Sequence, residues 1–419
     1  MELPKLRINI NWKSILIILS VIGPGIITSN VDNDPGGITI YSIAGANYGY
    51  ALLWILIPVF VLLVVIQEMC ARMGVVTGKG LADLIRENFG LRKTILLMLA
   101  LLLVNIGNTV SEFAGVAAAS EIFGVSRYIA VPLVAIAVWL LIVKGTFRSV
   151  EKVFLVASLF YVAYIISGFL AHPSWDSAVA GVVAPQFSMN SDLLLLLLAI
   201  IGTTIAPWMQ FFLQSAVVEK GIGVKDYKYA RLDVIIGSFA AVIVALFIII
   251  ACAATMNQQG IRITDAADAA RALAPLAGVY ASQLFAFGLL NAAIFSACIL
   301  PLCTAYYFCE AMGWDSGVNK KFSEAPEFYV LYTLILGLGA ALILIPGAPL
   351  IPIMIMSQFF NAILLPFVLI AMLMLANNRE IMGEYVNGTV TNLIAIASTI
   401  VLIVMSAVMA LSTLNVKVF

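Results

Sequence analysis

Charged residues are scarce in this sequence: only 11% of its 419 residues are Asp, Glu, Lys or Arg, and 63% are hydrophobic. No soluble domain has such a composition, which excludes soluble enzymes and soluble binding modules. The formal net charge is zero, which argues against a nucleic-acid partner. We therefore expect an all-α polytopic membrane protein whose main surroundings are the lipid bilayer.

Histidine and cysteine are nearly as scarce. The sole histidine, His172, falls in a polar segment, where a lone histidine is more often solvated than a ligand. No His-Glu-x-x-His zinc pair occurs, and no serine has an obvious base partner at membrane depth, so a membrane-embedded enzyme is disfavoured. The five cysteines lie within or at the ends of apolar spans without metal-ligand spacing, and we expect buried small hydrophobes: Cys70, Cys252, Cys298, Cys303 and Cys309.

Long apolar runs, by contrast, fill the chain. They predict eleven spans, at roughly 14–46, 49–71, 94–120, 128–143, 152–171, 192–219, 232–255, 279–309, 328–345, 350–376 and 389–414. Segment 72–93 is expected to hold a short amphipathic helix at the inner face. Segment 256–278, with Asp265, Asp268 and Arg271, is expected to hold a solvated helix at the outer face.

The basic residues support this count. With the N-terminus inside, 18 of the 22 Lys and Arg fall in inner segments: Lys5, Arg7, Lys13, Arg72, Lys79, Arg86, Arg92, Lys93, Lys144, Arg148, Lys152, Lys220, Lys225, Lys228, Arg231, Lys320, Lys321 and Arg379. The other four are Arg127, Arg262, Arg271 and Lys417. This bias is what the positive-inside rule requires. It predicts a cytoplasmic N-terminus and an extracellular C-terminus in a prokaryotic plasma membrane. The first span is too long for a signal-peptide core, so no cleavage is expected.

The first span is interrupted by Asp34-Pro35-Gly36-Gly37. An aspartate at mid-membrane depth costs roughly 2.5–3.5 kcal/mol, which something must offset. Pro35 breaks the helical hydrogen bonding, and the two glycines tolerate unusual backbone angles. We expect the helix to stop near Asp32 and to restart near Gly37, which leaves free carbonyl groups and a carboxylate for a cation at the midplane. A simpler alternative is that Asp34 only caps the second half-helix. Asp32 competes with Asp34 for the ligand role.

The sixth span repeats this anomaly at Pro207, which follows the small and hydroxyl residues of 202–206. Matching breaks five spans apart indicate an inverted repeat of five helices. The predicted organisation is one transmembrane domain, with repeats at 1–171 and 192–376 and an extra helix at 389–414. The alternative for Pro207 is a simple kink.

These residues resemble the NRAMP divalent-metal transporters over nearly the whole chain. Gly23-Pro24-Gly25 and Asp34-Pro35-Gly36-Gly37 resemble that family's opening and its Asp-Pro-Gly-Asn motif. The stretch 203–208 falls where the family has Ala-x-x-Met-Pro-His. Ser357-Gln358, Leu365-Pro366-Phe367 and Glu112 also match. The resemblance implies a LeuT-like fold with broken helices 1 and 6 and with substrate between them.

Four departures from that pattern are informative. Gly37 stands where the family has a liganding asparagine, and Ala206 where it has a methionine ligand. Trp208 replaces a histidine tied to proton transfer, and Thr109 falls where a third-span aspartate is usual. This pattern is similar to the NRAMP-related magnesium transporters. The resemblance to that branch implies Mg²⁺ transport, with Mn²⁺ also accepted and without proton coupling.

The chemistry of the donor set points the same way. A thioether suits transition metals, whereas Mg²⁺ prefers oxygen and sheds water reluctantly. The predicted metal site comprises Asp34, backbone carbonyls near Thr203, the Gln358 side chain, and the space left at Gly37 and Ala206. Asn361 either holds a coordinated water or hydrogen-bonds a neighbouring helix. Glu112 either adds negative electrostatic potential to the pocket or lines an aqueous path; the simpler alternative is a buried polar contact.

We therefore expect a monomeric, non-enzymatic facilitator that takes up Mg²⁺, or Mn²⁺, as a largely hydrated ion and holds no resident cofactor. The first alternative is a proton-coupled Mn²⁺/Fe²⁺ transporter. A sodium-coupled symporter of organic solutes is a second alternative on the same fold.

Overall fold

The structure, a computed structural model, describes residues 21–185, 191–263, 268–271, 273, 278–347 and 350–413. The start of the first predicted span, residues 14–20, lies outside these ranges. So do five charged residues discussed above: Lys5, Arg7, Lys13, Asp265 and Lys417.

Every regular element in the described ranges is a helix. The α-helices are α2 (Pro24–Val31), α3 (Pro35–Tyr48), α4 (Leu56–Thr77), α5 (Leu81–Phe89), α6 (Leu91–Ile122), α7 (Arg127–Lys144), α8 (Phe147–Leu159), α9 (Val162–Leu170), α10 (Trp175–Val183), α11 (Ser191–Thr204), α12 (Pro207–Glu219), α13 (Tyr227–Thr255), α15 (Val279–Met312), α16 (Pro326–Ile343), α17 (Leu350–Ala376), α18 (Arg379–Met382) and α19 (Thr389–Thr413). The 3₁₀ turns are η1 (Gly49–Ile55), η2 (Val224–Asp226), η3 (Asn257–Gln259) and η4 (Gly383–Tyr385).

Ten helical segments of the described chain are long and apolar enough to cross a membrane. The prediction was eleven, and the difference arises at the N-terminal end. The second half of the predicted first span and the whole second span form one helical segment, Pro35–Thr77, with η1 joining α3 to α4. The first half of that span is seen only as the eight-residue α2. The all-α, multi-pass fold class is confirmed.

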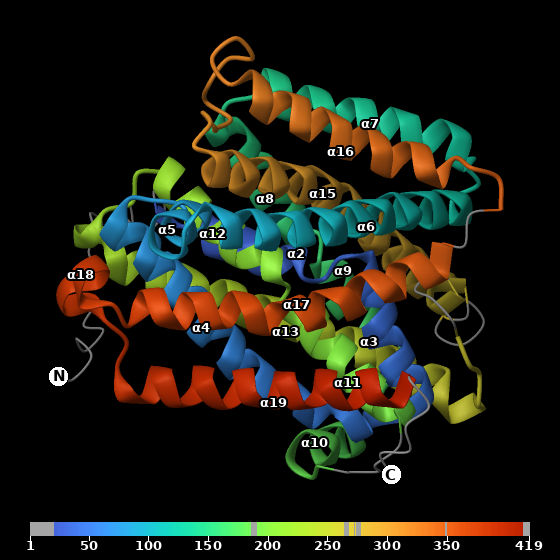
Figure 1. Cartoon of the computed structure of the whole chain (residues 1–419). Helices are drawn as coiled ribbons and strands as arrows, with labels where there is room; N and C mark the ends of the chain where they lie inside the picture. Colours follow the sequence, from blue (N-terminus) through green and yellow to red (C-terminus); the bar gives the residue numbers. More distant parts are fainter. Residues whose placement is uncertain are drawn as a thin grey trace, which may run out of the picture.

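The helices are packed in layers, with α7 and α16 side by side at one edge and α19 at the opposite edge (Figure 1). Helices α6, α15 and α17 lie between these edges, and α15 and α6 pack along each other. Burial increases from the helices at the edge to those at the centre. All residues of α12 from Pro207 to Val217 are buried, whereas α7 buries only four of its 18 residues. The outer helices therefore present apolar side chains to lipid, and the broken helices occupy the centre.

Helix α2 is held at its N-terminus by a buried carboxylate from α13. Asp233, 2% exposed, accepts hydrogen bonds from the backbone N–H groups of Gly23 at 3.2 Å, Gly25 at 2.6 Å and Ile26 at 3.3 Å. A negative charge there is favoured by the helix dipole. The two backbones also meet closely, since a Cβ on Gly237 would lie 2.6 Å from the Gly25 carbonyl oxygen. This contact fixes the start of α2, the half-helix that precedes the first break.

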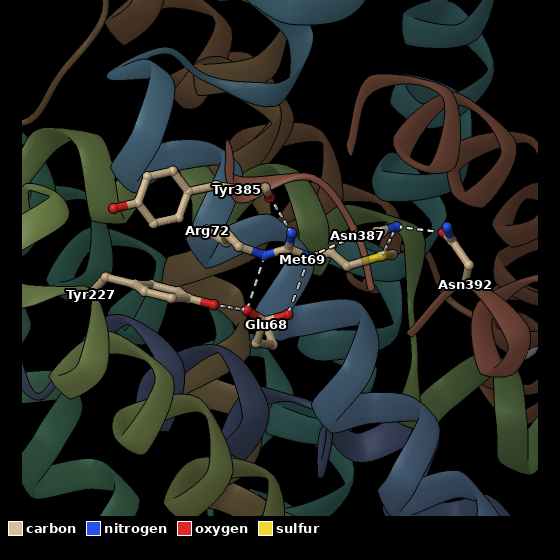
Figure 2. Close-up of polar contacts among 7 residues, drawn as sticks. All are labelled: Glu68, Met69, Arg72, Tyr227, Tyr385, Asn387 and Asn392. Atoms are coloured by element: carbon tan, nitrogen blue, oxygen red, sulfur yellow. Dashed lines mark hydrogen bonds and ion pairs between the residues drawn. The ribbon is translucent and has the colours of Figure 1, made fainter. Parts of the chain in front are cut away.

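A second polar cluster ties α4 to the connection between α17 and α19 (Figure 2). Arg72 forms an ion pair with Glu68, one turn away on α4, at 3.1 Å, and both side chains are at most 13% exposed. The Arg72 guanidinium donates to the carbonyl oxygen of Tyr385 and, at 2.6 Å, to Asn387 Oδ1. Tyr227, at the start of α13, donates its hydroxyl to Glu68. Three distant parts of the chain therefore meet on this ion pair.

The shorter elements follow the predictions in part. Helix α5 is amphipathic as expected and buries Leu81, Ala82, Leu84 and Ile85. Helix α10 was not predicted within segment 172–191. In the described part of segment 256–278, Arg271 and Asp268 form an ion pair at 3.5 Å with side chains 56% and 39% exposed, which fits a solvated surface. His172 is exposed and has a left-handed backbone with a φ of 48°.

Candidate metal-ion site

The first broken helix stops at Val31 and restarts at Pro35, two residues earlier than expected, because proline suits the first helical position. Asp34 has an extended backbone, and its Oδ1 accepts from the backbone N–H of Gly37 at 2.5 Å. Asp34 is therefore the N-cap of α3. This capping bond engages Oδ1 and leaves lone pairs on both carboxylate oxygens, so the capping role and an ion-binding role are compatible.

The second broken helix stops at Thr204 and restarts at Pro207, which confirms an interruption rather than a simple kink. Pro207 has no N–H, so the Thr203 carbonyl oxygen lacks its usual donor four residues on. The Ala206 carbonyl oxygen, by contrast, accepts from the Met209 N–H at 3.2 Å and from Gln210 Nε2 at 3.1 Å. Of the two carbonyl groups, that of Thr203 is therefore the more available to an ion.

The two breaks meet at Gly37. A Cβ built on this glycine would lie 2.5 Å from the Asp32 carbonyl oxygen, 2.7 Å from Thr203 Oγ1 and 3.3 Å from Asp34 Oδ1. Three oxygen atoms, contributed by both breaks, thus lie so close to Gly37 that any larger side chain at this position would collide with them. Thr203 Oγ1 is buried and has no hydrogen-bond partner in the described part of the chain. We call these three oxygen atoms the oxygen cradle.

Gln358 brings α17 to the same point. Its Nε2 donates to both carboxylate oxygens of Asp34, at 3.1 Å and 3.2 Å. Its approach needs Gly36, since a Cβ there would lie 2.3 Å from Gln358 Nε2. Asn361, one turn further along α17, donates to Gln358 Oε1 at 3.1 Å and also bonds Asn108 of α6. Asn361 therefore shows the helix–helix hydrogen bonding that was one of its two predicted roles.

Two further carboxyl groups lie near Asp34. Glu112 of α6 is fully buried, and its carboxyl group interacts with that of Asp34. Neither of its oxygen atoms has a hydrogen bond of acceptable geometry to another described residue. Asp32 is 2% exposed, and its side-chain oxygens are likewise without partners within the described ranges. It supplies its carbonyl oxygen, not its carboxylate, to the oxygen cradle.

The donor set is poor in nitrogen and sulfur. Among the described residues, no three His, Cys, Asp or Glu side chains are grouped so that they could hold a metal ion. One carboxylate, one hydroxyl, two backbone carbonyl groups and one amide remain. Such a set can bind a hard cation through oxygen, with water completing the shell.

A family model described as "Natural resistance-associated macrophage protein-like" matches residues 25–412. The chain belongs to the Nramp family. Its curated relatives include the divalent metal cation transporter MntH of Verminephrobacter eiseniae, 24% identical over 96% of this chain and 91% of the relative. MntH of Chromohalobacter salexigens is 29% identical over 87% of this chain and 85% of the relative.

Solved structures agree on the fold. A manganese transporter of Eremococcus coleocola in complex with an aromatic bis-isothiourea compound superposes with a TM-score of 0.78, at 21% identity over 96% of this chain and 88% of that one. The MhsT structure with L-phenylalanine superposes with a TM-score of 0.59 at 14% identity, over 94% of this chain and 97% of that one. This Nramp chain therefore has a LeuT-like fold and is a multi-pass membrane transporter, not an enzyme.

The positions predicted to depart from the family pattern are all buried in this Nramp protein. Ala206 is 2% exposed and Trp208 1% exposed. Thr109 is fully buried, and its hydroxyl donates to the Asn105 carbonyl oxygen at 2.7 Å, within its own helix. None of these side chains carries a group that titrates near neutral pH.

Sequence reasoning missed Asn105 and Asn108, which extend the polar contacts of Asn361 into α6. Their spacing of three residues on one face of an apolar helix was the available signal, because polar side chains in a membrane helix pair with one another. The partner helix could not be read from the sequence, since Asn361 lies 253 positions from Asn108.

Proposed function

We propose that this protein carries divalent metal cations across the membrane, chiefly Mg²⁺ and also Mn²⁺, as largely hydrated ions and without proton coupling. The observation that carries the proposal is the oxygen cradle at Gly37, which combines Asp34, Thr203 and the Asp32 carbonyl group without sulfur or imidazole. Mg²⁺ prefers oxygen ligands, whereas a thioether favours transition metals.

Every predicted site residue has a role in this proposal except Asn361, which hydrogen-bonds Gln358 and Asn108. Asp34 supplies charge, and Thr203 supplies its hydroxyl and carbonyl oxygens. Gln358 supplies its amide oxygen once its amide turns from the orientation seen here, in which Nε2 faces Asp34. Glu112 adds negative potential without touching the ion. Gly37 and Ala206 contribute by being small: a side chain at Gly37 would fill the cradle, and Ala206 offers no sulfur.

The structure represents a closed conformation, since Asp34, Thr203 and Gln358 are each at most 4% exposed. A single methyl-sized group would already clash with the oxygen atoms of the cradle, so the cradle in this state has no room for an ion with its complete water shell. A largely hydrated ion enters when the two breaks lie farther apart, and it exchanges a few waters for protein oxygens as they approach.

The proposed absence of proton coupling is supported by Trp208 and Thr109, neither of which has a side chain that titrates near neutral pH. The other proton-carrying groups near Asp34 are the carboxyl groups of Asp32 and Glu112. No coupling proton is needed for uptake. A divalent ion entering a negative cell gains about 4.6 kcal/mol per 100 mV of membrane potential.

The internal symmetry belongs to the same proposal. The proposal includes two inverted repeats, residues 1–171 and 192–376, followed by an extra helix at 389–414. It also includes a cytoplasmic N-terminus and a monomeric protein. Support comes from the two breaks, each of which ends at a proline: Pro35 begins α3 and Pro207 begins α12. Half-helix ends at matching positions of two repeats are the usual ion site of such transporters.

A proton-coupled manganese or iron transporter is the second candidate. It is favoured by the relatives, which are named MntH, and by the manganese transporter that shares the fold. Competition by Cd²⁺ separates the two candidates. A site built only from oxygen binds this soft ion weakly, so a large excess of Cd²⁺ should leave Mg²⁺ uptake nearly unchanged.

Purified protein in proteoliposomes tests the proposal. Asp34→Ala should abolish Mg²⁺ uptake, while Asp176→Ala, at an exposed position on α10, serves as the control with wild-type uptake. Retained uptake in Asp34→Ala would remove Asp34 from the site. Calorimetric titration of both variants with Mg²⁺ and Mn²⁺ would rank the two ions.

A further inference from the structure

A cavity of about 300 Å³ lies away from the oxygen cradle, at the C-terminal end of α12. Its wall comprises residues from the junction of α4 and α5, from α12, from α15 and from the loop that follows α15. Helix α5 packs against both α12 and α15 there (Figure 1). Helix α12 runs 13 residues from Pro207 at the second break to Glu219 in the cavity wall. This length of about 20 Å separates the cavity from the oxygen cradle. We call it the acidic cavity.

Glu310 of α15 supplies a buried carboxylate to this wall. It is 8% exposed, and its Oε1 accepts a hydrogen bond from Ser215 Oγ at 2.5 Å. A Cβ on Gly80 would lie 2.1 Å from Glu310 Oε2, so the carboxylate lies between two other residues of the wall. The Ala82 N–H interacts favourably with this carboxyl group, but Oε2 makes no hydrogen bond of acceptable geometry to any described residue. A buried carboxylate oxygen without a partner is unfavourable, which points to a cationic or hydrogen-bonding ligand.

Glu219, at the end of α12, provides a second carboxylate. One of its oxygen atoms accepts from the Tyr306 hydroxyl, and the other accepts from the Asn319 N–H at 3.2 Å. These bonds hold the carboxylate against the loop after α15, and each oxygen atom keeps a second lone pair. The Glu310 carboxyl group interacts electrostatically with those of Glu219 and Asp83. Carboxylates brought together in this way repel one another unless a cation lies among them.

The lysines of the wall do not neutralise the two glutamates. Lys79 donates to both carboxylate oxygens of Glu87, at 2.7 Å. Lys320 pairs with Asp315 and acts on Glu219 from beyond ion-pair distance. Within the described ranges, neither glutamate of the cavity forms an ion pair. The acidic cavity therefore keeps two carboxylates that a cation can neutralise.

We propose that the acidic cavity binds one hydrated divalent cation, Mg²⁺ or Mn²⁺, in addition to the ion at Asp34. Among the described residues, no three acidic, His or Cys side chains are grouped so that they could hold a metal ion directly. Two carboxylates are too few to replace the water of Mg²⁺, which dehydrates reluctantly, but they can accept hydrogen bonds from that water. Six waters fill about 180 Å³ at the density of the liquid, so the cavity has room for a complete octahedral shell.

Calorimetric titration of the purified protein with Mg²⁺ tests this site. Wild type should bind two equivalents, and Asp34→Ala should bind one. In the Asp34→Ala background, Glu310→Gln should lower the remaining affinity roughly tenfold or more, because it removes a charged acceptor. Glu380→Gln is the matched control, since it removes a carboxylate from an exposed position on α18 and should leave the affinity unchanged. An unchanged affinity in the Glu310→Gln variant would overturn the proposal.

Cobalt(III) hexaammine tests how the ion is held. Its ammonia ligands do not exchange, so it binds only where a cation is held through its ligand shell. It should compete with Mg²⁺ for the acidic cavity of Asp34→Ala, and Glu310→Gln should weaken both ions together. If it does not compete, the ion is not held through water and the proposal is wrong.

The proposed function and the second site fail differently. If Asp34→Ala binds no Mg²⁺, the acidic cavity is not an ion site, whereas the site at Asp34 stands. If Asp34→Ala binds as many equivalents as wild type, Asp34 is not the ion site, and the Glu310→Gln variant still decides the acidic cavity. Should Glu310→Gln not be recovered as a monodisperse protein, Glu219→Gln replaces it with the same expectations.

Discussion

Gly37 and Thr203 belong to different broken helices, yet a Cβ on the glycine would lie 2.7 Å from the threonine hydroxyl oxygen. This contact explains why residue 37 is small here. A side chain at this position would occupy the point on which the oxygen atoms of both breaks converge. Small size, and not backbone freedom, is the requirement, because Gly37 lies within α3.

Filling this point should block transport. Gly37→Ala places a methyl group among the three oxygen atoms, and we expect Mg²⁺ uptake to fall more than about tenfold, since a single lost ligand contact is worth one to several kcal/mol. Gly107→Ala on α6 is the control, because a Cβ there meets nothing within 4 Å. Equal uptake by both variants would show that the ion binds elsewhere.

Adding sulfur should change the selectivity. Ala206→Met introduces a thioether beside the second break, at a buried position. We expect Cd²⁺ and Mn²⁺ to bind more tightly and Mg²⁺ more weakly, because thioethers favour softer ions. Competition of Cd²⁺ against Mg²⁺ uptake measures the change. An Ala206→Leu variant controls for bulk, and an identical Cd²⁺ response in both would mean that residue 206 does not face the ion.

The sequence predicted the two breaks but not what surrounds them. Pro35 and Pro207 act on their own helices, so local chemistry was sufficient to place both interruptions. Gln358 could be assigned only from the resemblance, since it lies 324 positions from Asp34. Asn108 was missed because its partner lies on another helix. The sequence was also divided here into two spans, 14–46 and 49–71, whereas the turn η1 makes Pro35–Thr77 one helical segment.

The Asp233 contact with α2 should stabilise the fold. Asp233→Asn replaces one acceptor oxygen by a donor that faces the backbone N–H groups of Gly23, Gly25 and Ile26. We expect a loss of about 1–3 kcal/mol and a lower melting temperature in detergent. Asp176→Asn, on the exposed face of α10, should melt like wild type. An unchanged melting temperature for Asp233→Asn would contradict this role.

The buried ion pair between Arg72 and Glu68 predicts how single and double substitutions change stability. Arg72→Met leaves Glu68 largely buried without its cation, which should cost about 3–5 kcal/mol. Removing both charges in Arg72→Met/Glu68→Leu should cost less than the single change, because no uncompensated charge remains. Thermal melting of the two variants decides this. A double variant less stable than the single one would show that Glu68 is not left uncompensated when Arg72 is removed.

The central claim is that an oxygen-only site at Asp34 carries Mg²⁺ down its electrochemical gradient without a proton. Simultaneous recording of luminal Mg²⁺ and luminal pH in proteoliposomes under an imposed, inside-negative potential tests it most directly. We predict Mg²⁺ uptake that grows with the potential, is absent in Asp34→Ala, and leaves the luminal pH constant. Acidification of the lumen in proportion to Mg²⁺ uptake would contradict it.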